Sequence, residues 1–167
     1  PVPGVERGGR LFVRGPNVML GYLRAEQPGV IEPPEGGWYD TGDIVEIDAQ
    51  GFVTILGRAK RFAKVAGEMV PLGAVEDFIA RLWPGKGHAV VTVPDARKGE
   101  ALVLVTEQEG ASRSDLLAAA QKEGLPELFV PRALLPVKKL PLLGSGKTDY
   151  PAAKALAEEQ AGVASPA

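Results

Sequence analysis

The chain has 167 residues, of which 45% are hydrophobic and 24% charged, and its formal net charge is -2. This balance is typical of a folded globular protein, and the lack of a basic excess excludes a general nucleic-acid binder. With no cysteine and one histidine, the sequence also excludes disulfides, a cysteine nucleophile and a multi-histidine metal site. No apolar run reaches the roughly 20 residues that cross a bilayer. No signal segment opens the chain either, so we expect a cytoplasmic location.

Strand-like stretches and a hairpin make up the first third of the chain. Residues 10–14 are a short strand candidate, and residues 44–48 alternate apolar and acidic side chains. The Ala-Gln-Gly sequence at 49–51 predicts a turn into a further strand at 52–56, so we expect a β-hairpin here. Residues 24–37 are rich in proline and glycine and predict a surface loop.

A short polar break at residues 57–61 separates this stretch from a second β-rich one, and it is our candidate domain boundary. Residues 62–65 and 69–70 predict a second hairpin. Behind it, apolar side chains recur at helical spacing, and Pro71 suits the first helical position. They are Leu72, Val75, Phe78, Ile79 and Leu82.

The rest of the chain predicts strands and helices in alternation. Buried strands are expected at 88–93 and 101–105, and a last strand at 133–137. Ser112 begins a capping-box pattern and Gly124 can end the helix that follows, while a last helix starts near Pro151. Residues 61–167 thus predict one compact α/β unit of about 100 residues, close to the usual domain size.

A glycine-rich loop at residues 144–149, with the sequence Gly-Ser-Gly-Lys-Thr-Asp, looks like the tail of a nucleotide-binding P-loop. A P-loop needs a glycine at position 141, where this chain has Pro141, and too little chain follows Lys147 to supply its parallel strands. Lys147 precedes the last helix, whose free N–H groups and dipole attract anions, so it could reach a carboxylate or phosphate. On the loop alone, a solvated surface lysine is the better interpretation, because motif matches without structural context often misfire.

Three further groups could carry chemistry. Asp43 closes the segment Trp-Tyr-Asp-Thr-Gly-Asp at the mouth of a strand, where it could accept hydrogen bonds from ribose hydroxyls; an Asx turn is the plain alternative. Arg58 and Lys60 suit oxygen recognition, or else belong to a solvated linker. His88 opens an apolar strand and fits a structural role better than a catalytic one. The acyltransferase pattern H-x4-D fails at its aspartate position.

Four motifs in a fixed order favour the functional interpretations. They are Y-D-T-G-D at 39–43, D-x-x-G-F at 48–52, G-R-A-K at 57–60 and G-K-T-D at 146–149. In this order they resemble the acyl-adenylate-forming (AMP-binding) enzyme superfamily, which includes acyl-CoA synthetases, luciferases and peptide synthetase adenylation domains. The resemblance covers nearly the whole chain. Segments 61–70, 98–104 and 141–147 are also similar to the carboxyl end of the bacterial bifunctional 2-acylglycerophosphoethanolamine acyltransferase/acyl-acyl carrier protein synthetase.

The resemblance implies an α/β (α+β) fold in which residues 1–57 end a large amino-terminal domain. Residues 58–60 would be a hinge, and residues 61–167 a mobile lid whose central sheet is flanked by helices. The parent enzyme would convert a fatty acid and ATP, with Mg²⁺, into acyl-AMP and pyrophosphate. It would then pass the acyl group to the pantetheine thiol of acyl carrier protein or coenzyme A, and so feed lysophospholipid reacylation at the inner membrane.

The resemblance also implies a role for each site residue. Lys147 would be catalytic, bridging the acyl carboxylate and the α-phosphate. Asp43 would hold the ribose and Arg58 the nucleotide, whereas the lid would turn about Lys60 and carry the residues of the pantetheine path, Lys64 and Gly67. We expect no metal ligand and no bound cofactor in these residues. These residues contain neither the loop that grips the ATP phosphates nor the region that forms the acyl pocket. We therefore expect the chain alone to be inactive.

Two alternatives remain. The first is a non-catalytic α/β module that docks an acyl carrier protein or another acidic partner through its basic side chains. These are Lys60, Arg61, Lys64 and Lys86. The second is a P-loop NTPase, which Pro141 and the late position of the loop disfavour.

Overall fold

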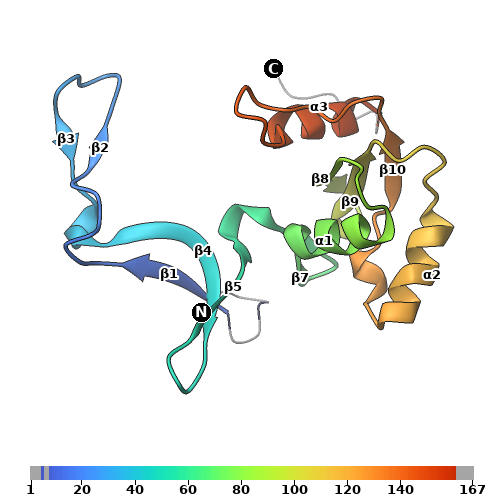
Figure 1. The fold of residues 1–167 in the computed structure, drawn as a ribbon, viewed down its shortest axis with the longest axis horizontal. Coiled ribbons are helices and arrows are strands. Elements are labelled where there is room, and N and C mark those ends of the chain that lie inside the picture. The colour runs from blue at the N-terminus through green and yellow to red at the C-terminus, as the bar shows by residue number, and fades with distance from the viewer. Residues whose placement is uncertain (1–4, 6–7, 161–167) are drawn as a thin grey trace. The chain divides into compact units, whose positions relative to one another are not determined.

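The computed structural model describes residue 5 and residues 8–160 (Figure 1). The chain divides into two compact units, Pro1–Lys60 and Arg61–Ala167. Each unit has sheets of its own, and helices of more than one turn occur in the second. The α/β class expected from the sequence is confirmed. That the chain turns about Lys60 stays a prediction.

An antiparallel three-stranded sheet forms the first unit, in the order β1 (Gly9–Val13), β4 (Tyr39–Ile47) and β5 (Val53–Arg58). The predicted hairpin between β4 and β5 is confirmed. Its turn is closed by Asp48, whose carboxylate accepts the backbone N–H groups of Gln50 and Phe52, each at 2.9 Å. This is the local side-chain bond by which aspartate stabilises turns.

The stretch between β1 and β4 is more ordered than the predicted loop. β2 (Tyr22–Leu23) and β3 (Ile31–Glu32) form a short antiparallel ribbon, followed by the 3-10 turn η1 (Glu35–Gly37). Arg24 Nε lies 2.7 Å from a Glu32 carboxylate oxygen and joins the two strands of the ribbon. A cross-strand pair of this kind depends on register, which composition alone does not indicate.

Five strands form the sheet of the second unit. They are β6 (Phe62–Val65), β7 (Glu68–Pro71), β8 (His88–Asp95), β9 (Gly99–Thr106) and β10 (Ala133–Pro136). β9 is central, because it pairs antiparallel with β8 and parallel with β10. The β6–β7 hairpin joins this sheet through the pair Val65 and Gly99 at the end of β9.

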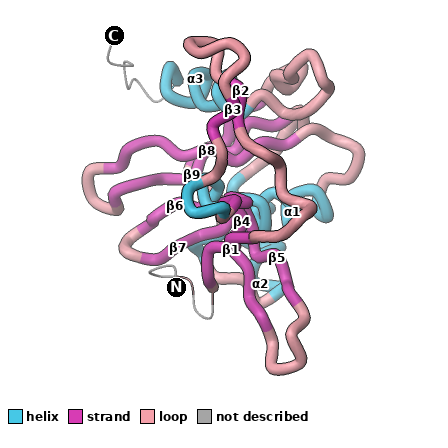
Figure 2. The backbone as a smooth tube through the Cα atoms, turned by 90° about the vertical axis from the view of Figure 1, so that its left-hand side faces the viewer, coloured by secondary structure: helices cyan, strands magenta, loops and turns pink. Residues whose placement is uncertain are grey.

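Helices cover both faces of this sheet (Figures 1 and 2). α1 (Leu72–Leu82) and α2 (Arg113–Glu123) pack on one face, and α3 (Tyr150–Gln160) packs on the other. The 3-10 turns η2 (Ala59–Arg61) and η3 (Glu127–Phe129) complete the described elements. None of the helices in residues 8–160 is long and apolar enough to cross a membrane.

Two predicted caps bound α2. The Ser112 hydroxyl accepts the N–H of Asp115 at 3.1 Å, and Gly124 ends the helix with a φ of 69°. A left-handed residue at this place favours glycine, which has no Cβ to clash. The capping pattern therefore predicted both ends of α2 correctly, although only Leu116 and Ala120 of this helix are buried.

Burial on both faces explains why β8 and β9 have nearly continuous apolar sequences. Val90, Leu102 and Leu104 face α1 and α2, whereas alternate residues such as Val91 and Val103 face α3. Phe78 of α1 is 1% exposed and is the largest fully buried side chain in the described residues. Its ring fills the layer between the sheet and α1.

Phe78→Ala should lower the free energy of unfolding of the second unit by about 3–5 kcal/mol, because it leaves a cavity in a close-packed core. Urea unfolding followed by Trp83 fluorescence in a Trp38→Phe background measures this. Phe52→Ala is the control, since Phe52 is 72% exposed and its loss should change that free energy by less than about 0.5 kcal/mol. Equal losses for the two variants would contradict this assignment of the core.

Candidate functional site

The loop that carries Lys147 is a closed turn. The N–H of Asp149 donates to the carbonyl of Pro141 at 2.9 Å, and the N–H of Leu143 donates to the carbonyl of Lys147 at 2.8 Å. Gly146 makes the tight corner with a φ of 81°. Lys147 is exposed on this turn, and its ammonium has no hydrogen bond or ion pair within residues 8–160. The interpretation of Lys147 as a solvated lysine in a flexible loop agrees with its exposed side chain. It does not agree with its backbone, which the hydrogen bonds of the turn hold.

Glu107 holds the start of this loop. One of its carboxylate oxygens accepts the N–H of Leu140 at 2.7 Å, and the other accepts the N–H of Gly87 at 3.1 Å. These two hydrogen bonds hold the pKa of the Glu107 carboxyl below its usual range. Leu140 is buried beside α3, so the chain enters the loop from a fixed point.

The end of the loop is the cap of α3. Asp149 accepts the N–H of Ala152 on its carboxylate at 3.0 Å and the N–H of Ala153 on its carbonyl at 2.9 Å. The anion-attracting helix start expected from the sequence is thus already occupied by a carboxylate of the chain itself. Lys147 must act through its own ammonium.

A partly buried ionic cluster lies where α3 begins. Arg61 Nη2 is 2.6 Å from Glu76 Oε1, at an angle that makes no hydrogen bond, and Arg61 Nη1 donates to the carbonyl of Val90 at 3.0 Å. The Tyr150 ring centre lies 3.7 Å from the guanidinium carbon of Arg61, and the Tyr150 hydroxyl donates to Glu76 Oε2 at 3.0 Å. Burial, together with the negative charge of Glu76, raises the pKa of the Tyr150 phenol.

Sequence reasoning missed the role of this cluster. It placed Arg61 among the exposed basic residues that could meet an acidic partner, but the Arg61 side chain is only 19% exposed and is paired with Glu76. Lys60, Lys64 and Lys86 are exposed, as the docking interpretation requires. The one available signal was Glu76, an acidic residue beside the apolar stripe of a predicted helix.

The first unit brings together two residues that the sequence singled out separately. Asp43 and Arg58 are direct cross-strand partners, and Arg58 Nε lies 3.1 Å from Asp43 Oδ1. Arg58 Nη1 also donates to the carbonyl of Thr41 at 2.7 Å, which holds the guanidinium across β4. The Asp43 side chain is 17% exposed and that of Arg58 is 64% exposed. The carboxylate is therefore largely enclosed by the chain, whereas the guanidinium reaches solvent.

Asp43 lies inside β4 rather than at its mouth, which corrects the position expected from the sequence. The strand begins at Tyr39 and continues through Gly42, whose φ of 72° is unusual for a strand. The N–H of Gly42 donates to Asp40 at 3.0 Å, and the Arg10 guanidinium pairs with the same carboxylate. Both contacts hold the pKa of Asp40 below its usual range. The glycine therefore shapes the strand without ending it.

The β6–β7 hairpin carries the two residues predicted for the pantetheine path. Lys64 is exposed on β6, and its N–H donates to Glu100 at 2.5 Å. Gly67 is in the turn with a φ of 91°, next to Ala66 with a φ of 52°. Both values belong to the tight two-residue hairpin turn that favours glycine. A Cβ at Gly67 would meet no atom within 4 Å, so the backbone conformation, and not a crowded neighbour, requires glycine here.

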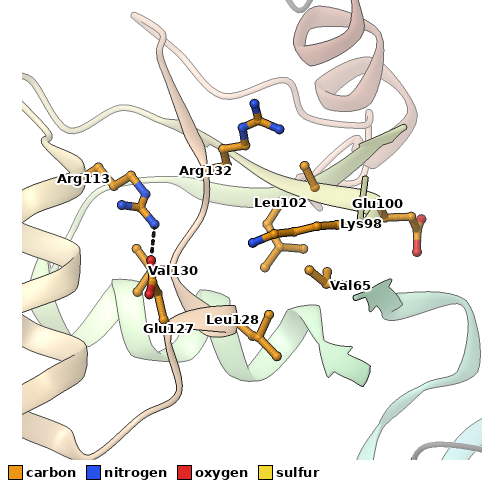
Figure 3. Close-up of a pocket in the computed structure, with 10 residues that line it drawn as sticks. Val65, Lys98, Glu100, Leu102, Arg113, Glu127, Leu128, Val130 and Arg132 are labelled. Atoms are coloured by element: carbon orange, nitrogen blue, oxygen red, sulfur yellow. Dashed lines mark hydrogen bonds and ion pairs between the residues drawn. The ribbon is translucent and has the colours of Figure 1, made fainter. Parts of the chain in front are cut away.

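A separate pocket of about 340 Å³ lies beside this hairpin (Figure 3). Lys98 extends along Leu102 over an apolar floor, and two arginines stand at the rim. Arg113 is 2.9 Å from Glu127, and Arg132 pairs with Asp95. The arginines are thus neutralised by the chain itself, and none of the predicted site residues lines this pocket.

His88 belongs to the fold. Its Nε2 lies 3.1 Å from the carbonyl of Trp83, and its Nδ1 lies 2.8 Å from the hydroxyl of Thr106, which is fully buried. Because a carbonyl only accepts, Nε2 must carry the proton in the neutral ring, and Nδ1 then accepts from Thr106. The two ring nitrogens therefore join β8 to β9 through Thr106 and to the end of α1 through Trp83.

Comparison with known proteins indicates what these sites belong to. No protein-family model matches the chain. A 3-[(3aS,4S,7aS)-7a-methyl-1,5-dioxo-octahydro-1H-inden-4-yl]propanoyl:CoA ligase from Rhodococcus jostii is 37% identical over 153 residues, covering 87% of this chain and 30% of that protein. The 2,3-dihydroxybenzoate-AMP ligase of Bacillus subtilis is 30% identical over 154 residues, covering 91% of this chain and 29% of the ligase.

The fold agrees with these relatives. The structure of o-succinylbenzoate CoA synthetase from Bacillus subtilis, in complex with its acyl-adenylate intermediate, matches with a TM-score of 0.72 and 27% identity. The match covers 88% of this chain and 30% of that one. The homologues are adenylate-forming ligases, and the chain is similar to their C-terminal part. It spans less than a third of the length of each relative.

Glu107→Gln should lower the free energy of unfolding by about 1 kcal/mol at neutral pH, because a glutamine amide has one acceptor oxygen and leaves either the Leu140 or the Gly87 N–H group without its acceptor. The folded-state pKa of Glu107 is depressed, so this contribution is fully present above the ordinary carboxyl pKa of 4.5. It should disappear as the pH falls through the lower folded-state value. Urea unfolding of both proteins between pH 7 and pH 3 measures the difference.

Glu109→Gln is the matched control, since Glu109 is exposed in the turn after β9 and its carboxylate holds neither of these N–H groups. A Glu107 difference that stays constant over this pH range would contradict the assigned hydrogen bonds.

Proposed function

We propose that the chain is the carboxyl-terminal part of an acyl-adenylating ligase and that Lys147 is its catalytic lysine. The observation that carries the proposal is the state of Lys147: its ammonium is exposed and unpartnered within the described residues, on a turn fixed at both ends. Exposed, unpaired lysines are common on protein surfaces, and it is the closed turn and the motif order ending in G-K-T-D that distinguish Lys147. The similarity to adenylate-forming ligases over most of the chain supports the same assignment.

In the first half-reaction, a carboxylate oxygen of the acid attacks the α-phosphorus of ATP, and pyrophosphate leaves. Negative charge gathers on the oxygens between the two reactants, and the Lys147 ammonium would stabilise it in the transition state. Asp43 would accept the ribose hydroxyls, and Arg58, which already spans β4, would contact the nucleotide. Magnesium would come with the ATP, because residues 8–160 hold no group of three metal-binding side chains.

In the second half-reaction, a thiol attacks the acyl carbonyl carbon and AMP leaves. The second unit would turn about Lys60 between the two steps, moving Lys147 out and bringing the β6–β7 hairpin in. Gly67 at the tip of that hairpin offers open space for a narrow pantetheine arm, and Lys64 is exposed on the same hairpin. The thiol acceptor in this proposal is coenzyme A or acyl carrier protein.

The finer assignment is a fatty acyl-acyl carrier protein synthetase linked to a lysophospholipid acyltransferase, with the protein in the cytoplasm or at the inner membrane. It rests on segments 61–70, 98–104 and 141–147 alone. The named relatives act, by their names, on polycyclic and aryl acids. Acyl-AMP formation is common to both assignments, so the tests below address that step.

The first unit supports the proposal through its surface. Large apolar side chains are exposed on its strands and turns, among them Leu20, Leu23, Phe52 and Ile55 at 81%, 70%, 72% and 65%. Exposed apolar side chains in such number mark a surface that another part of a protein covers. A larger domain, as in the relatives, would be that part.

The docking module is the second candidate, and the structure weakens it. Its basic surface loses Arg61 to the buried pair with Glu76, which leaves only three of the four proposed basic residues exposed. Electrostatic docking depends on exposed charge, so this surface is a poorer partner for an acidic helix than the sequence suggested.

Lys147→Ala in the full-length protein should lower acyl-AMP formation by about 100- to 1,000-fold, because a preorganised charge at the transition state is lost. Conversion of preformed acyl-AMP to thioester should change by less than about threefold, since Lys147 would be withdrawn in that step. Pyrophosphate release and thioester formation from synthetic acyl-AMP measure the two steps separately.

Lys154→Ala is the control, because Lys154 is a half-exposed lysine of α3 paired with Glu158 at 3.7 Å. It should leave both steps intact. An unchanged rate of acyl-AMP formation in Lys147→Ala would support the docking module and contradict the proposed function.

The 167-residue chain by itself should show no ATP–pyrophosphate exchange above background, because the residues that grip the ATP phosphates and the acyl pocket lie outside it. The measurement uses purified chain with ATP, magnesium and a range of fatty and aryl acids. Robust exchange would show that the chain contains a complete adenylation site.

A further inference from the structure

We infer that Tyr150, held by Arg61 and Glu76, is a positioning residue that fixes Lys147 for acyl-AMP formation. The inference rests on the function proposed above and extends it to three side chains that have no part in that mechanism. Tyr150 stands three residues after Lys147 and is the first residue of α3. Whatever fixes Tyr150 therefore fixes the end of the loop.

α3 needs such an anchor because its buried face is small. The fully buried residues of the helix are Ala153 and Ala157, which remove little apolar area from water. Methyl groups of this size permit the helix to rotate or slide with little loss of contact. The Tyr150 ring is the large partly buried side chain at the start of the helix, and it sets the position of that end.

The anchor is bound on both its ring face and its hydroxyl. The guanidinium carbon of Arg61 is 3.7 Å from the ring centre, and the hydroxyl donates to Glu76 Oε2 at 3.0 Å. Arg61 and Glu76 are 19% and 16% exposed, so solvent screens their attraction only weakly. Cation–π contacts and charge-assisted hydrogen bonds are strongest when partly desolvated.

Glu76 connects this anchor to the sheet. Its Oε1 accepts the N–H of Val90 in β8 at 2.7 Å and lies 2.6 Å from Arg61 Nη2. Arg61 in turn donates to the carbonyl of Val90 at 3.0 Å. The Glu76 carboxylate thereby connects α1, β8 and the start of α3, so the position of Tyr150 is set relative to the core of the second unit.

Lys147 is the residue that benefits. Its loop enters at Leu140, held by Glu107, and leaves at Tyr150, held by Glu76. Between these points the backbone is closed by its own hydrogen bonds, and Asp149 of the loop caps the start of α3. A catalytic group displaced by 1 Å can lose about 100-fold in rate, so the exit anchor should matter for the step that uses Lys147.

Arg61 also follows Lys60 directly in the chain. If the second unit turns about Lys60, the first side chain to move is the one that holds Tyr150. The contacts of Arg61 with Tyr150 would then make α3 and the Lys147 loop move together with Arg61. Acyl-AMP formation would depend on it, whereas the thiol step, which uses the β6–β7 hairpin, would not.

The test is Tyr150→Phe in the full-length protein, which keeps the ring over Arg61 and removes the hydroxyl, with its hydrogen bond to Glu76 and its interaction with the Thr148 side chain. We expect acyl-AMP formation to fall about tenfold in kcat, with the KM for ATP unchanged, because positioning and not binding is lost. Conversion of preformed acyl-AMP to thioester should stay within about twofold of wild type. Glu76→Gln, a second variant, should show the same split with a larger loss.

Glu123→Gln is the matched control, because Glu123 pairs with Arg81 at 2.8 Å on the surface of the same unit. The Arg81 side chain is 58% exposed and that of Glu123 is 41% exposed. It should leave both steps unchanged. The inference is overturned if Tyr150→Phe lowers both steps equally, which would be loss of structure, or lowers neither while Lys147→Ala abolishes acyl-AMP formation. If Lys147→Ala itself has no effect, the proposed function fails first, and the two failures are distinct.

Discussion

The second unit depends on the burial of one cation. Removing most of the Arg61 guanidinium from water is costly, and a single carboxylate does not offset that cost. The structure provides Glu76 from α1, the Val90 carbonyl from β8 and the Tyr150 ring from α3. Because these partners come from three elements, satisfying the charge also fixes how the elements meet. The apolar layers on the two faces of the sheet supply most of the stability, but they tolerate small shifts.

Two cations of this unit have opposite environments, and the contrast explains their roles. Arg61 is nearly enclosed and paired, so its charge is spent on structure. Lys147 is exposed and unpaired within the described residues, so its charge remains available to a substrate. Arginine suits the first task, because its planar group can be contacted on its face and its edge together. Lysine suits the second, because a compact ammonium on a long, flexible side chain can reach outward to a substrate.

Features set by neighbours in sequence were predictable. The Asp48 turn, the Ser112 cap and the strand pair around β9 follow from local hydrogen bonds and from the period of apolar residues. The place of Asp43 was not, because it was expected at the mouth of a strand, whereas β4 already begins at Tyr39 and continues through Gly42. The Arg61 cluster was also beyond local reasoning, since Glu76 and Tyr150 meet Arg61 only once the sheet and both helices are in place. Lys147 itself was recognised through motif order, but that its backbone is held at both ends was not.

If the second unit is a moving lid, as proposed, the closed loop and the partly buried Arg61 cluster together would solve one mechanical problem of that movement. A lid that delivers a lysine and then withdraws it can pivot freely at one point, but it must carry the lysine as a rigid body, or the geometry of delivery is lost. Anchors at Glu107 and at Tyr150 give the loop that rigidity without covering Lys147. Covering it would exclude substrate, and leaving the loop unanchored would spread the ammonium over many positions. The polar anchors therefore lie at the two ends of the loop, where they restrict the backbone and leave the Lys147 side chain free.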